Sequence, residues 1–322
     1  SGALATGAAL VGLLVVRRTS ELLVAATGFL AFALSSGAFI SLVNHYGRFD
    51  AMLFGFAFIV ASVGGGYALA SSALDRLARE PAALAPLEAP PETGSGPAVV
   101  VVSCVESPAY EPEATATLLQ TLTDEGLIDA SMGALPFLFF AQKARYRAIG
   151  GESPSTGQLQ SVAEKLSDSL PEWPVAWASC YGPDALANRV RDLAEKGYSP
   201  IAIAELAVAD SGHIAQAKNE TRALHLDACG VDVRYTAILA DSERIASAVA
   251  MRVTSTVDNP ATTGVVLVGH GQPEGRAHKN PEFDREESRF LNRVRLLLNE
   301  RGIAENRIRI AWAEWRDRKS VV

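Results

Sequence analysis

The sequence predicts an α/β protein with parallel sheets, preceded by membrane-spanning helices, and three observations lead to this fold class. Hydrophobic residues make up 48% of the 322-residue chain, and long apolar runs fill its N-terminal part. After Ala98, short apolar strands alternate with segments of helical periodicity, which is typical of doubly wound sheets. Gly264–Pro273 (GVVLVGHGQP) holds a continuous apolar run between glycines, as in a buried strand of a parallel sheet.

Two apolar runs predict membrane helices within residues 1–79. Leu22–Val43 is long enough to cross a bilayer. Ala3–Val16 resembles the end of an earlier span, so two or three helices are expected, and the alternative is a buried hairpin of a soluble core. Repeated spans do not fit a cleaved signal peptide. Ala51–Ala73, the second run, carries small residues that let membrane helices pack closely: Gly64, Gly65, Gly66, Ser71 and Ser72.

The positive charges that flank these runs predict the orientation. Arg17 and Arg18 precede the first long run, and Arg76 and Arg79 follow the second. By the positive-inside rule, Arg17, Arg18 and everything after Leu74 face the cytoplasm, as in a protein of a bacterial-type inner membrane. Residues 80–97 are rich in Pro and Ala and lack apolar periodicity, so we expect a flexible linker.

The remaining chain predicts alternating strands and helices in two similar halves. Residues 98–102 are expected to form a strand and residues 113–125 a helix. Residues 98–108 (AVVVVSCVESP) and Gly264–Pro273 both run from an apolar strand through a short turn to proline. Further helices are expected at 158–170, 184–196, 241–253 and 286–301, with glycines at 197 and 302 ending two of them.

Several ligand classes are excluded by motif and charge. No GxGxxG motif follows either strand and no GxxxxGK[ST] motif occurs, so a nucleotide cofactor is not supported. The net charge of −7 and the lack of a basic patch argue against a nucleic-acid partner. Cys104, Cys180 and Cys229 lack CxxC spacing, which supports no zinc knuckle, iron–sulfur cluster or disulfide framework. In a cytosolic domain, we expect all three to be reduced.

His270 is the strongest candidate for a reactive residue. Ligands of open α/β sheets bind beyond the carboxyl ends of the strands, and His270 follows such a strand directly. A neutral imidazole can accept a proton or bind ferrous iron near neutral pH. The alternative is a histidine that only ends the strand and bonds to the backbone.

A second segment resembles the ferrochelatase family. Ala144–Pro154 (ARYRAIGGESP), followed by Gln158 and Gln160, resembles the segment by which ferrochelatases are recognised, and the strand before His270 resembles the one that presents their catalytic histidine. The resemblance covers roughly Ala98 to Arg316. Other landmarks occur in family order: strands at Val175–Gly182, Ser199–Leu206 and Asp232–Leu239, and the turn at Asn280-Pro281.

The resemblance implies a fold, a reaction and a set of site residues. It implies a ferrochelatase-like pair of Rossmann-like domains, at 98–240 and 241–316, the second incomplete. The reaction is insertion of ferrous iron, as substrate, into protoporphyrin IX or coproporphyrin during haem biosynthesis. His270 is implied as catalytic and metal-binding, with His213 as a second metal contact. Substrate-binding residues would be Tyr146, Arg147, Ile149, Gly150 and Ser153, together with Phe137 and Phe140.

Two features of that set leave alternatives open at the sequence level. The run Pro136–Phe140 (PFLFF) could form the lip of a porphyrin pocket or belong to the core. Lys143, Arg145 or Arg147 could hold the propionate carboxylates or simply face solvent.

Both chain ends suggest a truncated reading frame. The family carries a catalytic glutamate beyond the strand that corresponds to Arg307–Ala313, and this chain stops first. Residues Asp317–Val322 (DRKSVV) read like a translated sequencing adapter, and no initiator Met is present, so the tail is expected to be non-native and the fragment inactive.

Two other functions remain open. A cobalt or sirohydrochlorin chelatase shares the fold and a strand-end histidine. It would need further metal-binding histidines at the cleft, and His213 is the one candidate for such a residue. A catalytically inactive porphyrin- or haem-binding membrane protein could use the same scaffold. The sequence carries no signal for the oligomeric state.

Overall fold

The computed structural model describes residues 2–46, 49–79, 87, 96–124, 128, 130–272 and 280–313. Most of the expected linker at 80–97 and all of the expected tail at 317–322 lie outside the described residues.

The chain divides into two compact units, each described by itself below. Unit 1 comprises Ser1–Ala85, Val105–Gln160 and Tyr181–Asp184, and unit 2 comprises Pro86–Cys104, Ser161–Cys180 and Ala185–Val322. The two units are defined by which residues contact one another in space. The expected domains at 98–240 and 241–316 stay a prediction.

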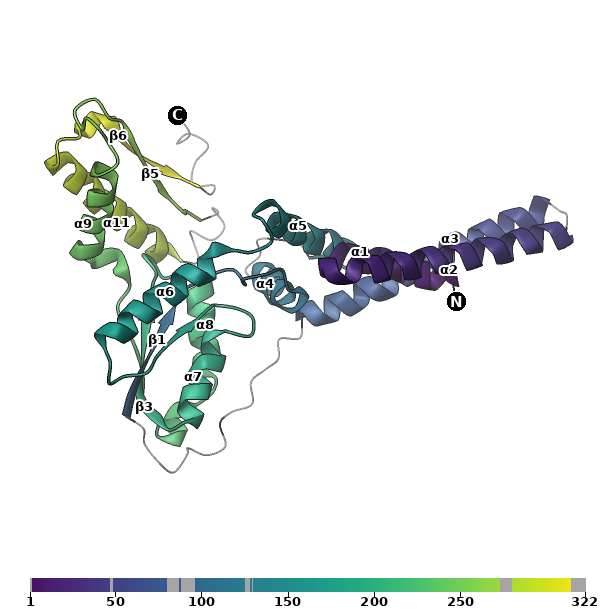
Figure 1. The fold of residues 1–322 in the computed structure, drawn as a ribbon, viewed down its shortest axis with the longest axis horizontal. Helices are drawn as coiled ribbons and strands as arrows, with labels where there is room; N and C mark the ends of the chain where they lie inside the picture. The colour runs from purple at the N-terminus through teal and green to yellow at the C-terminus, as the bar shows by residue number, and fades with distance from the viewer. Residues whose placement is uncertain are drawn as a thin grey trace. The chain divides into compact units, whose positions relative to one another are not determined.

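Three N-terminal helices form the long part of unit 1: α1 (Gly2–Val15), α2 (Arg18–Tyr46) and α3 (Phe49–Arg79) (Figure 1). Within α2 and α3, Ser20–His45 and Met52–Ala78 are long and apolar enough to cross a membrane. Large apolar side chains on both helices are exposed, for example Leu22 at 84% and Phe54 at 76%. The described residues thus contain two candidate membrane spans, as the apolar runs predict.

Glycines allow α1 and α3 to approach backbone to backbone. A Cβ atom at Gly7 would lie 1.9 Å from the Val63 carbonyl oxygen, and one at Gly66 would lie 2.0 Å from the Leu4 carbonyl oxygen. Any side chain at these positions would push the helices apart. The role predicted for small residues is thus confirmed at Gly66, whereas a Cβ atom at Gly64 would meet nothing within 4 Å.

The rest of unit 1 packs on the N-terminal helices. It contains α4 (Pro112–Asp124), α5 (Leu135–Ala148) and the start of α6 (Pro154–Ser169). The sequence predicts helices near α4 and α6 but not α5. One core joins α1, α3, α4 and α5, and its buried members are Val11, Val15, Ala78, Tyr110, Ala116, Leu119, Leu135, Phe139 and Tyr146.

Unit 2 contains a four-stranded parallel sheet in the order β2-β1-β3-β4. Its strands are β1 (Gly96–Val102), β2 (Val175–Ala178), β3 (Tyr198–Glu205) and β4 (Val233–Tyr235). The helices α7 (Leu186–Glu195) and α8 (Gly212–Arg222) pack against each other, and α7 also contacts β1 and β3. The chain runs from β1 outward to β2 and then returns to β3 on the other side. The carboxyl ends of β1 and β3 therefore form the switch point where ligands bind in open sheets.

A second, two-stranded parallel sheet pairs β5 (Val265–Gly269) with β6 (Ile308–Trp312). The helices α9 (Glu243–Thr254) and α11 (Pro281–Glu300) lie beside these strands (Figure 1). They share a hydrophobic core with them. The α/β class with parallel sheets is confirmed, while the ferrochelatase pairing of domains stays a prediction.

One expectation for β5 is wrong, since the strand is not buried on both sides. Leu267 is 7% exposed, whereas Val266 and Val268 are 62% and 61% exposed. Among the described residues, α9 and α11 share a core with one face of this strand. A continuous apolar run does not distinguish a strand that is covered on one face from one covered on both.

Candidate functional site

His270 lies directly after β5, at the carboxyl end of the strand, as predicted. Its Nδ1 lies 2.9 Å from the carbonyl oxygen of Gly271. A carbonyl oxygen can only accept, so the neutral ring in this geometry carries its proton on Nδ1, and the lone pair is left on Nε2. The ring also meets Phe283 edge-on, with centroids 6.4 Å apart.

A buried carboxylate holds the turn that carries His270. Glu287 on α11 accepts the backbone N–H of His270 through Oε1 and that of Gly271 through Oε2, the latter at 3.0 Å. Glu287 is only 8% exposed. Gly271 has a φ of 72°, a left-handed conformation that glycine adopts without steric cost.

The start of α11 also bonds to the segment that follows β3. The backbone N–H of Asp210 donates to Glu286 Oε2 at 3.0 Å, and Asn280 Nδ2 donates to the Asp210 carbonyl oxygen at 2.9 Å. Asn280 caps α11 by accepting the N–H of Phe283, and Pro281 occupies the first turn, where its missing N–H costs nothing. The family turn expected at Asn280-Pro281 is thus a helix start.

A buried ion pair lies at the end of β3. Glu205 is 2% exposed, and its Oε2 lies 2.9 Å from Lys218 Nζ on α8, which also contacts Asp210 Oδ2 at 3.2 Å. Burial raises the pKa of Glu205 above its ordinary value, although Lys218 opposes this shift. Burial alone lowers the pKa of Lys218, but Glu205 and Asp210 hold it above its ordinary value.

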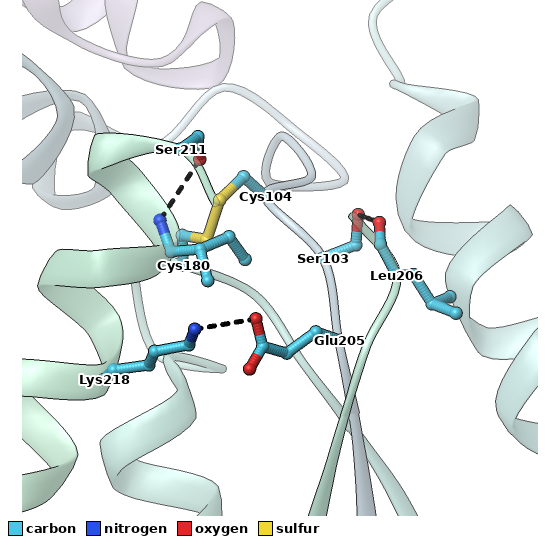
Figure 2. Close-up of a disulfide and its surroundings, with 8 residues drawn as sticks. Ser103, Cys104, Cys180, Glu205, Leu206, Ser211 and Lys218 are labelled. Carbon is cyan, nitrogen blue, oxygen red and sulfur yellow. Dashed lines mark hydrogen bonds and ion pairs between the residues drawn. A yellow bond between two sulfur atoms is a disulfide. The ribbon is translucent and has the colours of Figure 1, made fainter. Parts of the chain in front are cut away.

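The expectation that the cysteines are all reduced is wrong for two of them. Cys104 and Cys180 form a disulfide with Cα atoms 4.7 Å apart, whereas Cys229 is not disulfide-bonded. Figure 2 shows the disulfide and the Glu205–Lys218 pair together. The cysteines are 76 residues apart but follow β1 and β2, and neighbouring parallel strands bring their carboxyl ends together. Spacing along the chain does not reveal such a contact.

The expected substrate residues around Ala144–Pro154 lie in unit 1. Tyr146 is 4% exposed, its hydroxyl donates to the Ser107 carbonyl oxygen at 2.6 Å, and burial, helped by Glu106, raises its pKa to about 12. Arg147 forms an ion pair with Glu21. Tyr146 therefore belongs to the core, and Arg147 is already paired with a carboxylate.

The other cations of this segment are also paired. Lys143 is 3% exposed, and its ammonium donates to the Leu13 carbonyl oxygen at 2.8 Å and pairs with Glu21. Arg145 pairs with Glu106. Of these cations, Lys143 is too deeply buried to meet an external carboxylate.

The apolar run Pro136–Phe140 was expected either to form the lip of a pocket or to belong to the core, and its residues divide between buried and exposed positions. Phe139 is fully buried in the core of unit 1, whereas Phe137 and Phe140 are 59% and 42% exposed. Ile149, at the end of α5, is 45% exposed. These exposed residues could contact a flat apolar ligand.

The turn after α5 depends on its glycines. Gly150 and Gly151 have φ values of 92° and 96°, which favour glycine. Ser153 is 9% exposed, and its N–H donates to the Pro108 carbonyl oxygen at 2.9 Å. Gly150 and Ser153 therefore shape the turn.

His213 is the second residue of α8, just after the cap at Ser211, whose Oγ accepts the Ile214 N–H at 3.3 Å. In the part of the chain that the structure describes, no three His, Cys, Asp or Glu side chains are grouped so that they could hold a metal ion. His213 and His270 thus do not form part of a three-ligand cluster among those residues.

The sequence did not predict Glu287, Glu205 or Lys218 as parts of a site. A signal for Glu287 was present, because it shares the apolar face of its helix with Phe283, Phe290 and Val294. A glutamate at such a position has to find buried donors.

Comparison with known proteins gives a weak similarity. No family model matches the chain. The chain is 25% identical over 182 residues to a protein named ferrochelatase from Wolinella succinogenes, covering 53% of this chain and 55% of that protein. The chain thus spans about half the length of this curated relative. The similarity suggests a ferrochelatase-like, chelatase-type protein.

Proposed function

We propose that the protein is a membrane-anchored metal chelatase that inserts ferrous iron into a porphyrin, protoporphyrin IX or coproporphyrin, in haem biosynthesis. The observation that carries this proposal is the geometry of His270, with Nδ1 directed to the Gly271 carbonyl oxygen, so that the lone pair of the neutral ring lies on Nε2. The similarity to a ferrochelatase supports the reaction class. In this proposal, residues 98–240 and 241–316 are the two chelatase-like halves.

The reaction needs a base and a route for the metal. Two pyrrole protons leave the porphyrin, and a desolvated metal ion takes their place. Nε2 of His270 can accept a pyrrole proton or bind the incoming iron, because its lone pair is not used within the turn. Glu287 holds the turn that carries this imidazole by accepting two of its backbone N–H groups.

Porphyrin binding is assigned to exposed apolar residues of unit 1. Phe137, Phe140 and Ile149 offer apolar surface to the ring. Arg147 would exchange its bond to Glu21 for one to a propionate carboxylate, while Tyr146 would support this surface from the core.

The membrane is the second proposed partner, through α2 and α3. An apolar anchor suits a protein whose substrate is itself apolar. We place the α/β part on the cytoplasmic side of a bacterial-type inner membrane, because arginines flank the spans on that side.

Metal insertion by the protein expressed from its complete gene, in lipid nanodiscs, tests the proposal, with several porphyrins and divalent metals offered and the porphyrin absorption followed. His270→Ala should lower the rate at least about a hundredfold, the scale for losing a general base. His213→Ala should have a smaller effect. The matched control is His225→Asn, since His225 is exposed and has a φ of 49°, which asparagine tolerates.

Two outcomes would count against this assignment. Absence of insertion with every porphyrin and metal would exclude the chelatase function and favour an inactive porphyrin-binding protein. Near-normal insertion by His270→Ala, with loss in His213→Ala, would move the reactive centre to the segment after β3.

A further inference from the structure

We infer that Glu287 is a positioning residue, which acts on the reaction through His270 by fixing the turn and the tautomer of the imidazole. This inference rests on the proposed function for the role of His270 and adds a residue of α11 to the same site.

The first support is the way in which Glu287 uses both carboxylate oxygens. Each oxygen accepts one backbone N–H of the two residues that form the turn, His270 and Gly271. A carboxylate that is 8% exposed is costly unless such donors compensate for its lost hydration. Hydrogen bonds to an ionised acceptor are the stronger kind, so this side chain fixes two consecutive peptide groups.

The second support is the rigidity of the element that carries it. The side of α11 that bears Glu287 also bears Phe290, Leu291 and Val294, which share a core with β5. One turn before Glu287, Phe283 places its ring edge-on against the His270 imidazole. The same helix therefore contacts both the backbone and the side chain of His270.

The consequence concerns the nitrogen that His270 presents. Its Nδ1–H donates to the Gly271 carbonyl oxygen, so that oxygen must stay in place for Nε2 to keep the lone pair. Gly271 has a φ of 72° and is the residue best able to change conformation in this turn. The bond from the Gly271 N–H to Glu287 restrains it. Without that bond, the carbonyl can rotate away, and the imidazole loses the contact that selects its tautomer.

The neighbouring residue provides a matched control. Glu286 accepts one backbone N–H, that of Asp210, so a glutamine in its place can still accept through its amide oxygen. At position 287, a glutamine has one oxygen for two N–H groups, and its NH2 group faces the second donor. Glu287→Gln and Glu286→Gln are thus the same change on adjacent residues of one helix.

The experiment compares wild type, Glu287→Gln, Glu287→Asp and Glu286→Gln in the protein expressed from its complete gene. For Glu287→Gln, kcat for metal insertion should fall about 10- to 100-fold, the usual effect of removing a residue that orients a ligand, while KM for the porphyrin stays within about twofold. Amide exchange at His270 and Gly271 should become faster. Glu287→Asp, which keeps the charge, should recover part of kcat, and Glu286→Gln should resemble wild type.

A spectroscopic arm tests the inference without any turnover. In ¹⁵N spectra of the imidazoles, His270 should be the Nδ1-protonated tautomer in wild type and a mixture of tautomers in Glu287→Gln. If wild type inserts no metal, the proposed function fails, yet this arm still decides the role of Glu287. An unchanged tautomer in Glu287→Gln would overturn the inference. So would equal losses of kcat in both glutamine variants with faster exchange throughout unit 2, because that pattern indicates a structural role alone.

Discussion

At the scale of single residues, the Glu205–Lys218 pair is deeply buried within the described part of unit 2. Lys218→Met would leave the Glu205 carboxylate, 2% exposed, without its cation. Losing one partner of a buried pair costs about 3–5 kcal/mol, so the free energy of unfolding in urea should fall by about 3 kcal/mol. The control is Arg234→Met, which removes an exposed pair with Asp232 and should change stability by less than about 1 kcal/mol.

The same variant predicts a dependence on pH. A carboxyl group whose pKa is raised by folding stabilises the protein most at low pH, and this contribution is lost as pH rises through the raised pKa. Burial raises the pKa of Glu205, and removal of Lys218 takes away the opposing effect. The stability gap between Lys218→Met and wild type should therefore shrink as pH falls from about 8 to about 5. A gap that is constant over this range would contradict the pairing.

The position of His270 could be predicted from the sequence, whereas its partners could not. His270 could be placed at a strand end because a short apolar run followed by His-Gly is a local pattern. The Cys104–Cys180 disulfide and the bonds from Glu287 to the His270 turn join segments that are distant along the chain. Contacts of this kind depend on strand order and helix packing, which a single sequence does not reveal.

At the scale of elements, the crossing of α1 and α3 depends on the absence of side chains. Gly66→Ala would place a methyl group 2.0 Å from a backbone oxygen of α1, so the helices must separate. We expect a loss of about 1–3 kcal/mol, the scale of overpacking, seen as a lower midpoint of thermal unfolding in detergent. Gly64→Ala is the matched control, because its methyl group meets nothing within 4 Å. Equal midpoints for the two variants would contradict this crossing.

Elements with clear periodicity were predicted near their observed positions. The helices α4, α7 and α9 carry apolar residues at helical spacing, and such patterns depend on local sequence alone. The helix α5 was missed because its aromatic residues face both ways: Phe139 is buried, whereas Phe137 and Phe140 are exposed. An apolar run without a polar face carries no period to detect.

At the scale of the whole molecule, the proposed orientation in a membrane decides which compartment surrounds the α/β part. A reporter fused within residues 80–95 should lie in the cytoplasm, and one inserted at residues 47–48 on the opposite side, because arginines flank α2 and α3 on the first side. Reporter activity in cells measures this directly.

An outside location of the first reporter would contradict the cytoplasmic placement. It would agree with a permanent Cys104–Cys180 disulfide, because disulfides persist in oxidising compartments and are rare in the cytosol. Alkylation of thiols in intact cells, with Cys229 as the internal standard, would then show which state the pair adopts.

The shared core of unit 1 has a practical consequence for truncation. A chain shortened to begin at Gly96 would keep α4 and α5 but lose Val11, Val15 and Ala78, which belong to the same core. Leu135 and Phe139, both fully buried in the intact chain, would lose part of that cover. Such a chain should aggregate in size-exclusion chromatography without detergent. The N-terminal helices are thus part of what keeps the rest of unit 1 folded, and removing them to simplify purification would expose this core.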